Sequence, residues 1–157
     1  MAMGWPLFSR LVANLRLVRC TFMPSEERAG QGGMLTGAIA AGIREILPSD
    51  EFELRATDMT INIRGIGRCS GYSYSTAPFL LWNLPSPASE RLERIFDIQS
   101  RGLQEFITNA RHEPWPARGA EAHVRVTPDE VAVWWGGPRE VDALVSLSPI
   151  SRRDLGV

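Results

Sequence analysis

Four residues in the second half of the chain have side chains suited to metal binding or acid–base catalysis. His112 and Glu113 are adjacent, and Glu121 and His123 follow shortly after them. Two imidazoles and two carboxylates could ligate a metal ion or exchange protons with a substrate. Their spacing does not match a zinc pattern such as His-Glu-x-x-His. We expect His112 at the C-terminus of a helix, where its charge interacts with the helix dipole, and His123 at a solvated position of a strand. These ordinary roles explain both histidines without a joint site. We therefore predict no metal site and no catalytic residue.

Three glycines, Gly65, Gly67 and Gly71, are spaced much as in a phosphate-binding loop and follow an expected strand. Such a loop needs a helix directly after the glycines, because free N–H groups and the helix dipole must face the phosphate. The chain continues instead with Tyr72 and a serine-rich stretch typical of a strand or loop. A turn between two strands is the favoured interpretation.

Nucleophilic catalysis also lacks a sequence pattern. There is no Gly-x-Ser-x-Gly motif, and neither Cys20 nor Cys69 has a histidine nearby in the sequence. All 17 basic residues are arginine, which excludes Schiff-base chemistry and a P-loop lysine. Two cysteines do not form a disulfide framework, so we expect free thiols and a cytoplasmic location. We expect no cofactor.

The overall charge gives no reason to expect a nucleic-acid partner. The formal net charge is −1, so there is no general attraction to phosphate backbones or anionic lipid. No apolar stretch is long enough to cross a bilayer.

The tryptophans point to a protein partner. Trp134 and Trp135 are adjacent in an expected strand, so their side chains leave opposite faces of the sheet. If helices cover only one face, one of the two lies exposed on the other. Trp115, between two prolines, is expected near the same edge. Exposed tryptophan beside arginine is typical of protein-binding hot spots, so these three residues form our predicted surface for a partner or for self-association.

A second hypothesis places a small-ligand site at the C-terminal end of the longest helix. His112, Trp115 and His123 would converge there and line one concavity. The protein would then be a ligand-binding protein or an enzyme.

Hydrophobic periodicity predicts the elements that must position these residues. Residues 34–47 and 87–111 have helical spacing of apolar residues. Alternation predicts a hairpin around Asp58, a second hairpin around Asp129 and a last strand over 141–147. The apolar run 79–82 is predicted as a buried strand.

Residues 1–33 differ from the rest. They include a basic amphipathic segment, residues 6–22, followed by residues 24–33, which we interpret as a flexible linker before Met34. Three interpretations stay open: a segment that is disordered or not natively translated, a docked helix, or one that contacts a membrane surface.

We therefore predict a single α+β domain over 34–157. An antiparallel sheet of about five to six strands would carry both helices on one face, in the order α-β-β-β-α-β-β-β, with a helix-plus-hairpin unit that repeats weakly. At the level of topology this order resembles the small α+β fold of bacterial secretion chaperones, but fold alone does not carry function. The favoured function is a non-enzymatic adaptor, chaperone-like or immunity-type protein that binds through its open sheet face or a strand edge.

Overall fold

The computed structural model describes residues 26–157. Three α-helices, two short 3-10 helices and seven strands occur in this part of the chain. The helices are α1 (Glu26–Ile46), α2 (Phe79–Trp82) and α3 (Ala88–Arg111), and the 3-10 helices are η1 (Gly67–Cys69) and η2 (Glu140–Asp142). The strands are β1 (Phe52–Ala56), β2 (Ile61–Gly65), β3 (Ser73–Thr76), β4 (Glu121–Val126), β5 (Glu130–Gly136), β6 (Ala143–Ser146) and β7 (Ile150–Ser151).

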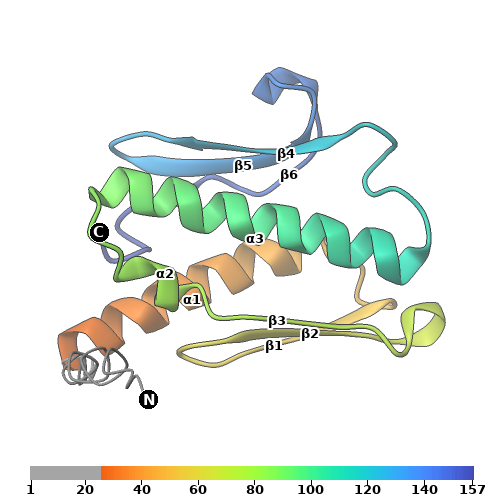
Figure 1. Cartoon of the computed structure of the whole chain (residues 1–157), viewed down its shortest axis with the longest axis horizontal. Coiled ribbons are helices and arrows are strands. Elements are labelled where there is room, and N and C mark those ends of the chain that lie inside the picture. The colour runs from red at the N-terminus through yellow and green to blue at the C-terminus, as the bar shows by residue number, and fades with distance from the viewer. Residues whose placement is uncertain (1–25) are drawn as a thin grey trace, which may run out of the picture.

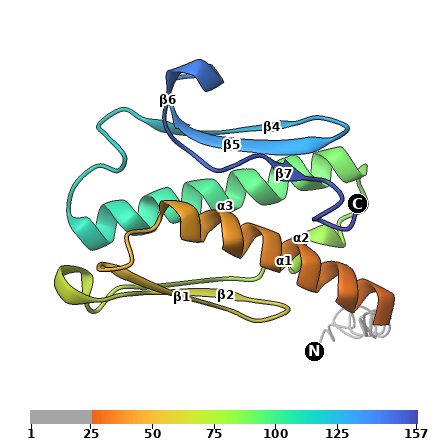
Figure 2. The ribbon, with the colours of Figure 1, turned by 180° about the vertical axis from the view of Figure 1, so that it is seen from behind.

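The long helices α1 and α3 lie between two antiparallel sheets (Figures 1 and 2). One sheet has the order β1-β2-β3, and the other has the order β4-β5-β6 with β7 also paired to β5. The α+β class and the antiparallel pairing are confirmed. The strands form two sheets, where the sequence predicted a single sheet with both helices on one face.

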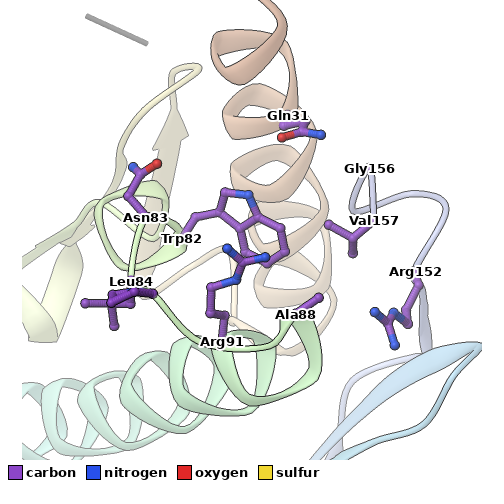
Figure 3. Close-up of a pocket in the computed structure, with 10 residues that line it drawn as sticks. Gln31, Trp82, Asn83, Leu84, Ala88, Arg91, Arg152, Gly156 and Val157 are labelled. Carbon is purple, nitrogen blue, oxygen red and sulfur yellow. The ribbon is translucent and has the colours of Figure 1, made fainter. Parts of the chain in front are cut away.

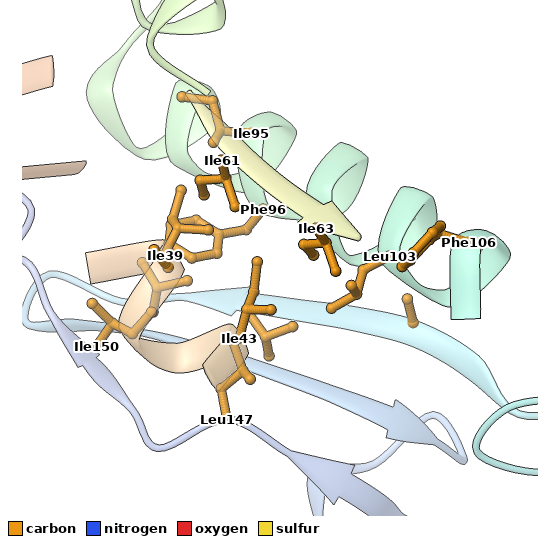
Figure 4. Packing of buried hydrophobic residues seen from close by; sticks show 14 of the residues in the cluster. Ile39, Ile43, Ile61, Ile63, Ile95, Phe96, Leu103, Phe106, Leu147 and Ile150 are labelled. Atoms are coloured by element: carbon orange, nitrogen blue, oxygen red, sulfur yellow. The ribbon is translucent and has the colours of Figure 1, made fainter. Parts of the chain in front are cut away.

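The separation into two sheets follows from the apolar surface of α3. Phe106 packs on Phe52 of the first sheet, with ring centroids 5.5 Å apart. The indole N–H of Trp135, in the second sheet, donates to the backbone oxygen of Ser100 at 3.2 Å. One helix therefore presents buried surface in two directions. Each sheet has one apolar face to bury, and the central helices provide a place for both. Figure 4 shows Ile39 and Ile43 of α1 packed within this core.

Helix α3 matches its prediction to within one residue. Its buried residues recur at helical spacing, and it ends at Arg111, followed by His112, whose φ of 57° lies in the left-handed region. No side chain caps its N-terminus, which begins after Pro87.

Helix α1 begins at Glu26, well before the predicted start at Met34, so residues 26–33 are helical and are not a linker. Gly32 is buried because Phe79 packs directly on it; a Cβ there would lie 2.7 Å from the ring atom Cδ2. Tertiary packing of this kind overrides the weak helix propensity of the glycines. The predictions for residues 1–25, including membrane contact by residues 6–22, lie outside the described residues.

Residues 79–82 form helix α2, so the predicted strand there is wrong. Phe79 and Trp82 are buried while Leu80 is exposed. Positions three apart share one face of a helix, which explains how a short apolar run can bury both aromatic rings. No helix within residues 26–157 has the length and apolarity needed to cross a membrane.

Both predicted hairpins form, as β1–β2 and β4–β5. The last predicted strand is shorter than expected, because η2 occupies residues 140–142 and β6 starts at Ala143. A helix followed by an antiparallel sheet occurs twice along the chain. The proposed internal duplication stays a prediction.

Candidate functional site

The three tryptophans predicted to bind a partner are all buried. Trp115, Trp134 and Trp135 expose 7%, 6% and 1% of their surfaces. Trp115 and Trp135 pack edge to face beneath the second sheet, with ring centroids 5.2 Å apart. The expectation that one tryptophan lies exposed on an open sheet face is therefore wrong.

Trp134 does face away from the helices, but the chain itself covers it. Its indole N–H donates to the backbone oxygen of Gly137 at 3.1 Å, and its ring stacks on His123 with centroids 5.4 Å apart. Arg125 on the same strand as His123 forms an ion pair with Glu140 of η2 at 2.8 Å. The segment that leaves β5 thus closes over the tryptophan, a feature that strand alternation cannot predict.

The second predicted set, His112, Trp115 and His123, does not converge. The ring of His112 contacts Tyr72, whose hydroxyl lies 3.2 Å from Nε2. Trp115 packs on Trp135, whereas His123 stacks on Trp134. Consecutive side chains of a strand leave opposite faces, so Trp115 and His123 lie on opposite sides of the second sheet. The structure gives these residues no common concavity.

The glycine-rich segment after β2 is a turn containing η1, as favoured from the sequence. Gly65 is required there by a close approach, because a Cβ would lie 1.9 Å from the backbone oxygen of Cys69. Within residues 26–157, no three or more His, Cys, Asp or Glu side chains are grouped as they would be around a metal ion.

Among the residues whose burial the structure describes, one carboxylate, Glu51, is buried, and two arginines bind it. Glu51 precedes β1 and accepts hydrogen bonds from Arg111 Nε at 2.7 Å and Arg68 Nε at 2.9 Å. Burial acts to raise the pKa of Glu51, but the bonds from the two guanidinium groups outweigh it and hold the pKa below its ordinary value. A carboxylate held ionised in this way is suited to joining elements and not to exchanging protons.

A polar pocket of about 600 Å³ opens beside the N-terminus of α3 (Figure 3). Its wall comes from distant parts of the chain: α1, the end of α2, the start of α3 and the segment after β7. No Asp or Glu side chain lines it. The lining residues are Gln31, Trp82, Asn83, Leu84, Pro85, Ala88, Arg91, Arg152, Gly156 and Val157.

Arg91 is held in this pocket by an aromatic ring. Its guanidinium carbon lies 4.2 Å from the ring centroid of Trp82, a cation–π distance. Its Nε is buried and has no hydrogen-bond partner among the described residues. An unpaired buried N–H is costly, and a ligand oxygen could satisfy it once the side chain turns its Nε toward the pocket.

Arg152 lines another part of the wall, just after β7. Its Nη1 donates to Ser89 Oγ at 3.3 Å and to the backbone oxygen of Thr127 at 3.4 Å. Both acceptors are neutral. Within residues 26–157, neither Arg91 nor Arg152 forms an ion pair. The pocket therefore holds two guanidinium groups and no acidic side chain, and Val157, the last residue of the sequence, also lines it.

The start of α3 adds to this positive character. The first intrahelical hydrogen bond runs from the N–H of Arg91 to the oxygen of Pro87, so the N–H groups before it have no helical acceptor. The positive end of the helix dipole lies at Ala88, which is part of the pocket wall. Two guanidinium groups and a helix N-terminus together are suited to an anion.

Sequence reasoning missed this site because its residues are far apart and individually ordinary. Arg91 has the appearance of a solvated helix residue, and Arg152 lies after the last strand predicted from the sequence, residues 141–147. Only the packing of α2 against the start of α3 brings Trp82 beside Arg91.

Comparison of the chain with known protein families, curated proteins and solved structures finds no match.

Proposed function

We propose that this protein is a non-enzymatic binding protein for a small organic phosphate, held in the pocket between Arg91 and Arg152. The observation that carries the proposal is the pair of arginines, which have no acidic partner among residues 26–157, together with the buried and unpaired Nε of Arg91. Guanidinium groups match the oxygens of a phosphate in both charge and geometry.

The charge of the pocket favours a phosphate monoester over a single carboxylate. A phosphate monoester carries close to two negative charges at neutral pH. The two guanidinium groups would balance that charge, and the first turn of α3 would add N–H donors. The pocket volume of about 600 Å³ leaves room for an organic group beside the phosphate. Gln31 and Asn83 offer amide groups for hydroxyl or carbonyl oxygens of that group.

The proposal describes binding without catalysis. No histidine or carboxylate side chain lines the pocket, so it holds no group suited to general acid–base or nucleophilic chemistry near pH 7. The pocket lies at the opposite end of α3 from the site proposed on sequence grounds.

Isothermal titration calorimetry with phenyl phosphate tests the proposal. Arg91→Gln and Arg152→Gln should each weaken binding by about tenfold or more, since each removes one charged donor. Arg44→Gln and Arg153→Gln are matched controls, because both change exposed arginines outside the pocket. Thermal unfolding without ligand checks that each variant still folds. The proposal fails if the natural protein shows no saturable binding, or if the pocket variants bind as well as the controls.

A second candidate function is the protein-binding role predicted from the sequence. Burial of the three tryptophans removes its original motive, but strand edges remain: within the described chain β3 pairs only with β2, and β4 pairs only with β5. A strand edge with unpaired backbone groups can accept a further strand.

A further inference from the structure

The outer edge of β4 has free backbone groups. The N–H of Thr127 donates to the oxygen of Glu130 at the turn of the β4–β5 hairpin. Hydrogen-bonded and non-bonded pairs alternate in an antiparallel ladder, so the N–H and C=O groups of Ala122, Val124 and Val126 point away from β5. None of these groups forms a backbone bond to another segment within residues 26–157.

A groove of about 530 Å³ lies between this edge and α3. Ala122, His123 and Val124 line one side. The other side is a charged row on α3, which we name the α3 row and which consists of Glu90, Glu93, Arg94, Asp97 and Arg101. Val124 is partly exposed at this edge, whereas Ala122 is only 2% exposed, so the side chains that cover Ala122 must move before a strand can pair there.

We propose that a second copy of this chain pairs with the β4 edge, antiparallel and about a twofold axis through His123. The two four-stranded sheets would join into one continuous sheet. With the axis at His123, Ala122 lies opposite Val124 of the second copy, so the free backbone groups of both edges pair with each other. This inference does not depend on the anion pocket.

Charges on the outer face of the sheet favour this register. Glu121 then lies opposite Arg125 of the second copy, and symmetry forms that pair twice. Opposite charges on facing residues stabilise strand pairing. Arg125 already contacts Glu140 and, at 3.7 Å, Glu130, but it is partly exposed and has N–H groups left to donate. An axis through Val124 would instead place His123 opposite Arg125, which provides no charge pair.

Charges on α3 complement one another about the same axis. The twofold reverses the direction of the second α3, so that Glu90 meets Arg101 and Arg94 meets Asp97. Both pairs have their midpoint between Arg94 and Asp97, the part of the helix that shares the groove with His123. Asp97 already pairs with Arg101 at 2.8 Å within one copy, so the new contacts would extend this pair into a network. The charges on β4 and the charges on α3 would thus each meet opposite charges of the second copy about the same twofold axis.

Sedimentation of the full chain as a function of concentration tests the dimer. Glu121→Arg and Arg125→Glu, made singly, should each raise the dimer dissociation constant by about tenfold, because each places like charges opposite one another. The double variant, with both charges exchanged, should recover affinity to within about threefold of the natural protein. Recovery is expected only if the two residues face each other across the interface.

A second variant tests the backbone pairing without altering charge. Val124→Pro removes an N–H that points out of the β4 edge and is not used in the hairpin, so it should abolish the dimer. Circular dichroism checks that the monomer still folds, and Val124→Thr serves as its control. A natural protein that stays monomeric at about 100 µM overturns the proposal. The proposal is also overturned if the double charge variant does not recover dimer affinity. A Val124→Pro protein that folds and dimerises normally would overturn it as well.

Discussion

Replacing Glu51 with glutamine tests whether a single buried carboxylate ties three elements together. Glu51 lies directly before β1, Arg68 in η1 and Arg111 at the end of α3. The side chains of Glu51 and Arg111 are only 12% and 16% exposed. Glutamine keeps the size of the side chain but removes its charge, so Arg111 is left partly buried without a counterion.

The expected loss is about 2 kcal/mol of unfolding free energy, since a hydrogen bond to a charged group contributes roughly 1.5–3 kcal/mol. For a chain of this length that loss lowers the unfolding midpoint by about 6 °C. Glu53→Gln is the matched control, because Glu53 also contacts two arginines, Arg55 and Arg64, but on the exposed surface of the β1–β2 hairpin. Surface pairs of this kind contribute little, so the control should resemble the natural protein.

The pH dependence gives an independent check of the same interaction. Because the folded-state pKa of Glu51 lies below its ordinary value of 4.5, its stabilisation is fully present above that value and is lost as pH falls through the folded-state pKa. The difference between the natural protein and Glu51→Gln should therefore shrink below about pH 4. Urea unfolding followed by tryptophan fluorescence at several pH values measures both effects. A Glu51→Gln protein as stable as the Glu53→Gln control at pH 7 would refute the reasoning.

Three further substitutions test the packing, each measured by urea unfolding. Gly65→Ala should lower the unfolding free energy by about 3 kcal/mol or more, because its Cβ would overlap the backbone oxygen of Cys69; an unchanged midpoint would be inconsistent with that contact. Gly37→Ala, on an exposed position of α1 with open space around it, should instead raise stability by roughly 0.5–1 kcal/mol, and a loss would argue against a helix there. Trp135→Ala should cost about 3–5 kcal/mol through the cavity and the lost bond to Ser100, whereas a loss below about 1 kcal/mol would place this indole outside the core.

Periodicity alone predicts α3 and the two hairpins, because those segments satisfy their local pattern. Helix α3 has a single apolar stripe, and the strands around Asp58 and Asp129 alternate cleanly, so local preference and tertiary packing agree. Helix α1 is extended past its predicted start because Gly32 lies against Phe79, a contact between segments that are distant in sequence.

The errors share one physical origin: sequence patterns show which faces are apolar but not what covers them. An outward-facing Trp134 was expected to need a partner, yet Gly137 and His123 of the same chain cover it. Likewise, the single apolar stripe on α3 led us to predict a single sheet. In the structure the two sides of that stripe pack against two different sheets. The anion pocket has no local signature at all, because Arg91 and Arg152 approach one end of α3 only in the folded chain.

The side-chain N–H of Arg91 provides the most direct test of the anion pocket. Nuclear magnetic resonance of arginine Nε–H groups can follow it while phenyl phosphate is added to the natural protein. We predict that the Arg91 and Arg152 signals shift together and saturate, while those of exposed arginines such as Arg44 and Arg153 stay in place. Signals that shift equally for all arginines, or an Arg91 signal that does not move, would contradict the account.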